Sequence, residues 1–170
     1  MTRHATQGFT LVEVLIVVVI LGILAAVVIP QFSNASAAAR ASMLADDLRV
    51  MRTQVMVFKA QHNSISPGYP DGDATQAPTE TAFVAHITQA SQADCQTAPP
   101  GTANYPYGPY MRRMPENPVN GNSSVLVLGD GASLPTTPND SYGWVYQPFT
   151  LIFMASASGS DETGRAYIDY

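Results

Sequence analysis

The sequence predicts an α+β protein in which a long N-terminal helix packs on a small antiparallel β-sheet. Residues 9–30 form an apolar run whose single charge is Glu13, and residues 31–62 contain neither Gly nor Pro. Short segments rich in β-branched and aromatic residues, separated by turn residues, follow between 123 and 155. A helix followed by short strands is typical of the α+β class.

Composition limits what the chain can do. It has 170 residues, a formal net charge of −5 and only 12% charged residues, about half the usual share of about 25%. This acidic balance, without a basic patch, argues against nucleic-acid binding through a charge footprint. Cys95 is the single cysteine, which excludes an intramolecular disulfide, and we expect its thiol to be buried or half-buried.

The apolar run over residues 9–30 is long enough to span a membrane, which takes about 20 residues. A carboxylate such as Glu13 at membrane depth costs about 2.5–3.5 kcal/mol, so it needs a partner or a function. The preceding residues 1–8 are a short polar leader with Arg3 and His4, which favours a cytoplasmic N-terminus. A secretory signal peptide or a plain membrane anchor would also fit the apolar run, but neither explains Glu13.

The helix is expected to continue beyond the membrane segment. Pro30 removes one backbone hydrogen bond, so we expect a kink there. Residues 31–62 then present one apolar stripe with steps of three and four, typical of a helix that is buried on one face. The stripe consists of Ala37, Ala41, Leu44, Leu48, Met51, Val55 and Phe58. We expect one helix over about 9–62, roughly 80 Å long at 1.5 Å per residue, covered by a sheet from the same chain rather than paired in a coiled coil.

Residues 31–170 form the predicted head domain, which begins with this amphipathic helix. Residues 63–122 are rich in loops, with a short helix over 79–90 that Thr79 caps. The inward side chains of that helix are expected to be Phe83, Val84 and Ile87.

Residues 123–155 are expected to hold the sheet. A strand over 125–128 precedes a hairpin formed by 142–147 and 150–155, and the remaining residues 156–170 form a polar tail.

No catalytic arrangement is visible, so the sequence predicts a structural protein and not an enzyme. The three histidines are too scattered for a metal triad, and no Gly-rich phosphate loop follows a strand. The aromatic residues of the head are expected to pack in the core and the turns. They are Tyr105, Tyr107, Tyr110, Trp144 and Tyr146.

Two sets of motifs resemble one known family. The leader ending in Gly8, followed by Phe9-Thr10-Leu11-Val12-Glu13 and later by Gly22 and Pro30, resembles the prepilin signal of type IV pilins and type II secretion pseudopilins. Residues 108–115, 117–121 and 143–146 resemble the head of the major, G-type pseudopilin. The resemblance implies a pilin-like fold.

The resemblance also implies processing and assembly. A prepilin peptidase would cut after Gly8 and methylate the new amine of Phe9. Phe9, Glu13, Gly22 and Pro30 would then serve assembly into a homo-oligomeric filament, with the Glu13 carboxylate paired to the Phe9 ammonium of a neighbouring subunit.

The implied setting is the bacterial inner membrane, crossed once, with the head in the periplasm. The implied partners are the other pseudopilins and the inner-membrane assembly platform, and the implied role is a pseudopilus that drives protein export. A type IV pilus pilin is the alternative, but the lack of a cysteine pair favours the pseudopilus.

Calcium is the one cofactor that the resemblance implies, and no other feature of the sequence points to it. G-type pseudopilins bind calcium in a C-terminal loop, and the hard oxygen ligands available here are Asp161, Glu162 and Asp169. A solvated acidic tail is the alternative for these residues.

Overall fold

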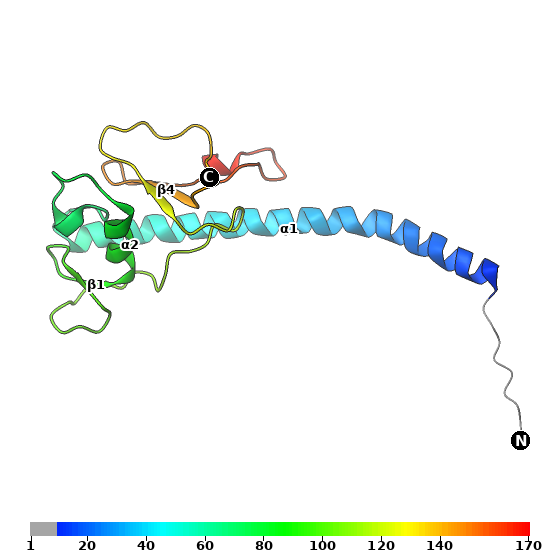
Figure 1. Ribbon diagram of the computed structural model, residues 1–170, viewed down its shortest axis with the longest axis horizontal. Coiled ribbons are helices and arrows are strands. Elements are labelled where there is room, and N and C mark those ends of the chain that lie inside the picture. Colours follow the sequence, from blue (N-terminus) through cyan, green and yellow to red (C-terminus); the bar gives the residue numbers. More distant parts are fainter. Residues whose placement is uncertain (1–9) are drawn as a thin grey trace, which may run out of the picture. The chain divides into compact units, whose positions relative to one another are not determined.

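The computed structural model describes the backbone of residues 10–170 and the side chains of these residues except 29–35. The chain divides into two compact units, Met1–Ala37 and Ala38–Tyr170. Helix α1, Leu11–Gln61, contributes to both units, and short helices and small sheets follow it in the head (Figure 1). The α+β class and the long N-terminal helix are confirmed.

The second half of α1 buries the predicted stripe. Six of its residues are less than 9% exposed, and Ala37 at its start is half-buried. Burying a large apolar side chain stabilises a fold by about 1.5–3 kcal/mol, so this stripe is a main contribution to the head's stability. The six are Ala41, Leu44, Leu48, Met51, Val55 and Phe58.

Helix α2, Glu80–Thr88, covers one part of the stripe. The Thr79 hydroxyl accepts a hydrogen bond from the Ala82 amide at 3.1 Å, as predicted for the cap. Phe83 and Ile87 lie in the core, and Val84 packs against it partly buried. The Glu80 carboxylate also accepts the Val125 amide at 2.8 Å, which ties α2 to the first strand of the sheet.

A three-stranded sheet shares this core with the stripe. Its strands are β3, Val125–Val127, β4, Trp144–Gln147, and β5, Ile152–Ala155, in the order β3-β4-β5. β4 and β5 form the predicted antiparallel hairpin, whereas β3 pairs with β4 in parallel. The expectation of a purely antiparallel sheet is therefore wrong at this one pair. The long connection 128–143 makes the parallel pairing possible, because such pairs need a crossover of about a dozen residues or more.

A second, two-stranded sheet lies in the region expected to be loops. Its strands, β1 at Ala90–Ser91 and β2 at Thr97–Ala98, pair antiparallel, and the 3₁₀ helix η1, Pro70–Gly72, precedes α2. Strands of two residues carry no periodic signal, so only the pairing defines them.

The last residues are more ordered than a polar tail. The 3₁₀ helix η2, Tyr167–Asp169, turns two side chains inward, and Tyr167 and Ile168 are both 7% exposed. Tyr167 belongs to the same core as the α1 stripe. The prediction of a polar tail is wrong for these two residues, because their apolar side chains are buried in the head, whereas Glu162 and Asp169 of the same segment are exposed.

Two methionines on α1 provide a matched test of the buried stripe. Met51 is 0% exposed and Met43 is 57% exposed. We expect Met51→Ala to lower the free energy of unfolding by about 2–5 kcal/mol, because it leaves a cavity in the core. Met43→Ala should change it by less than about 0.5 kcal/mol. Denaturant unfolding of the full chain in detergent measures both, and equal effects would contradict the assigned packing.

Candidate functional site

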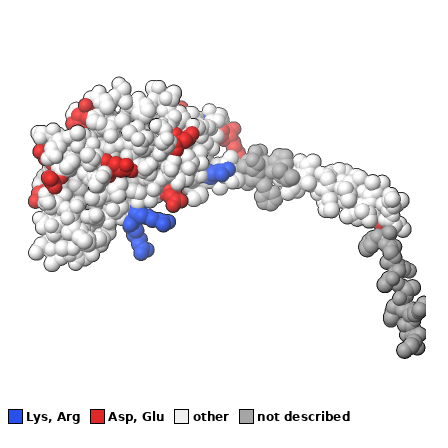
Figure 2. Space-filling view, viewed as in Figure 1, with Lys and Arg blue, Asp and Glu red and all other residues white. Residues whose placement is uncertain are grey.

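The first half of α1 presents apolar side chains on every side. From Leu11 to Val28 the helix is long and apolar enough to cross a membrane. Its large apolar side chains are 44–81% exposed, so the chain itself does not cover them. Figure 2 shows the visible face of this segment as almost entirely uncharged. An apolar surface of this size requires lipid or other apolar helices as its surroundings.

Glu13 closes a capping box at the start of this helix. Its Oε2 accepts the Thr10 amide and the Thr10 hydroxyl, both at 2.8 Å, and the Glu13 amide donates to Thr10 Oγ1 at 3.3 Å. A Thr followed three residues later by Glu satisfies amide donors that a helix start leaves unpaired. Glu13 Oε1 takes part in none of these three hydrogen bonds. The carboxylate thus fixes the helix start, and among the described residues no donor reaches its Oε1.

Of the other expected assembly residues, the structure describes Gly22 fully and Pro30 by its backbone only. A Cβ added at Gly22 would meet nothing within 4 Å, so that position is a gap in the helix surface. The backbone of α1 continues through Pro30, whose side chain lies outside the described part of the chain. Gly8 and Phe9, the expected cleavage and methylation residues, also lie outside the described residues.

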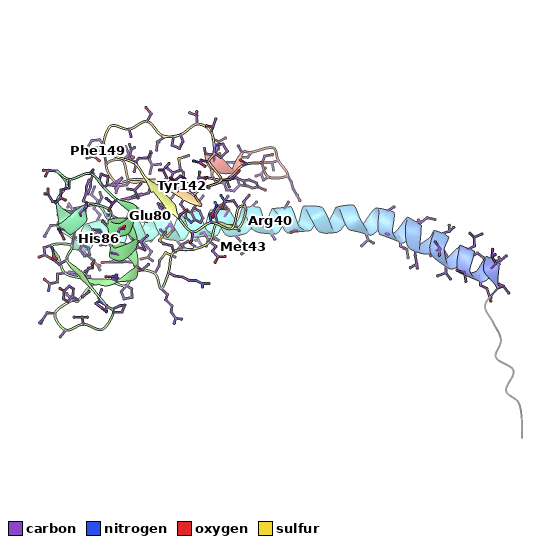
Figure 3. All side chains as sticks on the ribbon, viewed as in Figure 1. Arg40, Met43, Glu80, His86, Tyr142 and Phe149 are labelled. Atoms are coloured by element: carbon purple, nitrogen blue, oxygen red, sulfur yellow. The ribbon has the colours of Figure 1, made fainter. Side chains whose placement is uncertain are left out.

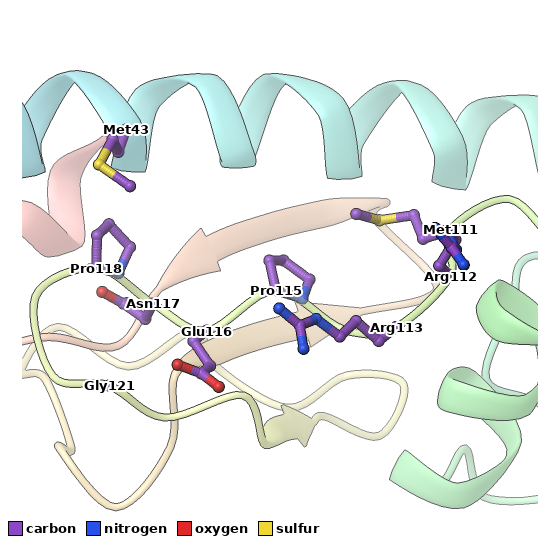
Figure 4. Close-up of a pocket in the computed structure, with 9 residues that line it drawn as sticks. All are labelled: Met43, Met111, Arg112, Arg113, Pro115, Glu116, Asn117, Pro118 and Gly121. Carbon is purple, nitrogen blue, oxygen red and sulfur yellow. The ribbon is translucent and has the colours of Figure 1, made fainter.

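A groove runs beside α1 in the head. It is lined by residues between 111 and 121, part of the segment that resembles G-type pseudopilins. It has a volume of about 590 Å³, and exposed Met43 forms one side of it (Figure 4). The opposite side is the loop with Arg112 and Arg113, both exposed. Asn117 holds the end of this loop, because its side chain donates to the Gly143 carbonyl at 2.8 Å and accepts the Val119 amide at 2.9 Å. The turn closes with the Gly121 amide on the Asn117 carbonyl, at a positive φ of 74° that glycine adopts without strain.

Comparisons of the sequence with known proteins identify the family of this chain. Residues 3–29 match the model of the prokaryotic N-terminal methylation motif. The type II secretion system core protein G of Klebsiella michiganensis is 30% identical over 129 residues, which cover 76% of this chain and 79% of the relative. The chain belongs to the type II secretion system core protein G family.

Other relatives carry the same name. The core protein G of Pectobacterium carotovorum is 29% identical over 153 residues, covering 83% of this chain and 86% of the relative. That of Escherichia coli K12 is 28% identical over 121 residues, covering 71% of each. No solved structure matches the chain.

The calcium ligands expected of a core protein G are not brought together here. Within residues 10–170, no group of three or more His, Cys, Asp or Glu side chains could hold a metal ion. Glu162 and Asp169 are exposed, and the Asp161 carboxylate is engaged by donors of the chain itself.

The burial of two histidines, His62 and His86, was not predicted from the sequence. The Phe58 ring stacks on both, with centroid distances of 3.7 Å to His62 and 4.9 Å to His86. Figure 3 labels His86 in the head. His62 Nδ1 donates to the Phe58 carbonyl at 2.7 Å, so its Nε2 accepts from the Ser91 hydroxyl at 2.8 Å. His86 Nδ1 accepts the Gly68 amide at 3.1 Å. The signal was present, because His62 continues the α1 stripe four residues after Phe58.

Both histidines are held neutral, and Cys95 is held as a thiol. Burial lowers the pKa of His62, while burial, followed by repulsion from His62, lowers the pKa of His86 to about 4. Burial raises the pKa of Cys95 to about 11, with Asp94 adding to the shift. The thiol is 1% exposed, as expected, and a thiol of this kind is inert. These groups therefore pack the head as uncharged side chains.

The buried His86 predicts a loss of stability in acid. Its pKa is about 4 in the folded chain and about 6.5 unfolded, so below pH 6.5 the unfolded chain binds a proton that the folded chain does not. Its contribution is fully present above pH 6.5 and is lost as the pH falls towards 4, by up to about 3 kcal/mol. Denaturant unfolding of the full chain at several pH values measures this loss. His86→Gln does not titrate and should flatten the slope, and an unchanged slope would contradict the assignment.

Proposed function

We propose that this chain is a structural subunit of a type II secretion pseudopilus. The observation that carries the proposal is the exposed apolar helix Leu11–Val28 with a single carboxylate at its start, in a member of the core protein G family. Such a helix is stable in lipid before assembly and among identical helices after it. No enzymatic step belongs to this role.

The proposed topology follows from charge and hydropathy. The leader with Arg3 and His4 would stay cytoplasmic, because basic flanks favour that side of the membrane. The apolar helix would cross the inner membrane once and place the head in the periplasm. A prepilin peptidase would cut between Gly8 and Phe9 and methylate the new amine.

Assembly would move the helix from lipid to a packed filament core. In that core, Glu13 Oε1 can accept the Phe9 ammonium of a neighbouring subunit while Oε2 keeps its bonds to Thr10. Two such charges are costly alone in a dry environment and tolerable as a pair. The pair would set the axial register of the subunits more than it would add stability. The other pseudopilins and the inner-membrane assembly platform would be the partners of this step.

Processing is tested first, by intact mass and N-terminal sequencing of the protein from its native membrane. We expect a chain that starts at Phe9, with one added methyl group. In Gly8→Leu we expect the leader to be retained, because a bulky side chain replaces the glycine at the cleavage bond. A wild-type chain that starts at Met1, or beyond residue 25, would contradict the proposal.

The charge of Glu13 is tested separately from its cap. Glu13→Gln keeps an acceptor for Thr10 but removes the charge, whereas Glu13→Val removes both. We expect both variants to insert and be cut, and both to give a filament yield lower by about tenfold or more, the effect of about 1.4 kcal/mol per contact. Electron microscopy of sheared filaments, with immunoblotting, measures the yield. A normal yield from Glu13→Gln would contradict the ion pair and leave Glu13 as a cap only.

A further inference from the structure

The C-terminal segment is closed by a network that uses arginines where the family resemblance implies calcium. Ser160 and Ala166 form an antiparallel bridge, so the residues between them make a closed loop. η2 follows at once and buries Tyr167 and Ile168. The oxygens around this loop are a carboxylate and main-chain carbonyls, the ligand types that calcium takes.

Asp161 is the centre of the loop, and the chain supplies its hydrogen-bond donors. Oδ1 accepts the Thr163 amide at 2.8 Å, the Thr163 hydroxyl at 2.6 Å and the Arg165 amide at 3.0 Å. Oδ2 accepts the Tyr170 hydroxyl. The bonds from Thr163 and then from Tyr170 hold the pKa of Asp161 well below its usual range. Both carboxylate oxygens of Asp161 therefore accept hydrogen bonds from the chain, whereas a metal ligand needs an oxygen that is free to bind the ion.

Arg165 supplies positive charge at the same place. Its Nη2 donates to the Asp169 carbonyl, and its guanidinium carbon lies 4.3 Å from the centre of the Tyr170 ring. A guanidinium over a tyrosine ring is favourable and rigid, because the planar group both stacks and donates.

Arg52 joins this loop to the long helix. Its Nη2 donates to the main-chain oxygen of Tyr170 at 2.6 Å, and its Nε donates to the Phe153 carbonyl on β5 at 2.9 Å. Partial burial, and then repulsion from Arg165, lower the pKa of Arg52, which is consistent with two cations facing one cluster of oxygens. A divalent cation placed there would meet both of them.

We propose that Arg165 and Arg52 take the place of calcium in this chain, so that its head folds and stays closed without the metal. The donor set does not fit calcium, because Asp161 is saturated by the chain and the exposed Glu162 and Asp169 are not gathered around it. This proposal is about the folding of the head, so it does not depend on whether the chain forms a filament.

Thermal unfolding of the full chain in a non-ionic detergent tests this, with excess calcium chloride or with EGTA. Trp144 is fully buried, so its fluorescence reports the melting of the head. We expect the wild-type Tm to agree between the two conditions within about 1 °C. Equilibrium dialysis with radioactive calcium should show no bound ion. A rise in Tm of about 4 °C or more with calcium, or one bound ion per chain, would overturn the proposal.

Variants test whether the contribution of Arg165 to stability is specific to its contacts or is an effect of surface charge in general. Arg165→Ala should lower the Tm by about 4 °C or more in both conditions, without rescue by calcium. Arg165→Lys should fall between, because it keeps the charge but loses the planar group. Arg49→Ala is the matched control, since Arg49 is exposed on α1 and pairs only with Asp46 at 3.2 Å among the described residues. An unchanged Tm in Arg165→Ala would overturn the role of Arg165, and the wild-type comparison decides the calcium question even if a variant fails to fold.

Discussion

The buried stripe of helix α1 is the contact on which the head depends. Every other element of the head is too short to be stable alone, since the strands have two to four residues and α2 has nine. Helix α2, strands β3, β4 and β5 and the 3₁₀ helix η2 share one core with residues of the stripe from Ala41 to Val55. The helix therefore acts as the template, and the sheet, α2 and η2 are held in place by burying apolar surface against it.

The same helix meets a different demand in its first half. There the apolar side chains surround the axis, and none of the window Leu11–Val28 is buried by the chain. A helix of this kind needs lipid or other helices on all sides, whereas the second half needs a cover on one face only. Under the proposed function, this change of pattern along one helix lets the subunit lie in a membrane first and pack in a filament afterwards. Glu13 is tolerated at the start of this segment because Thr10 already satisfies one of its oxygens.

Several polar groups inside or against the head form hydrogen bonds with distant parts of the chain. His62 and His86 stay neutral because burial lowers the pKa of both rings. His62 pairs with the Phe58 carbonyl and the Ser91 hydroxyl, and His86 accepts the Gly68 amide. Arg52 reaches main-chain oxygens on β5 and at Tyr170, the latter 118 positions away. Such bonds add little individually, but they decide which loops are closed, because a buried or half-buried polar group without a partner is costly.

The sequence by itself determined the long helix, its two halves, the capped helix α2, the hairpin β4–β5 and the special position of Glu13. These features depend on periodicity, hydropathy and capping, which act over a few residues and are visible in any single chain. Only the tertiary structure decided the parallel pairing of β3, the small sheet β1–β2, the burial of His86, and the partners of Asp161. Asp161 and Glu162 look alike as candidate calcium ligands in the sequence. Their roles differ because Thr163, Arg165 and Tyr170 gather around Asp161 alone, and that depends on how the folded chain returns to its own core.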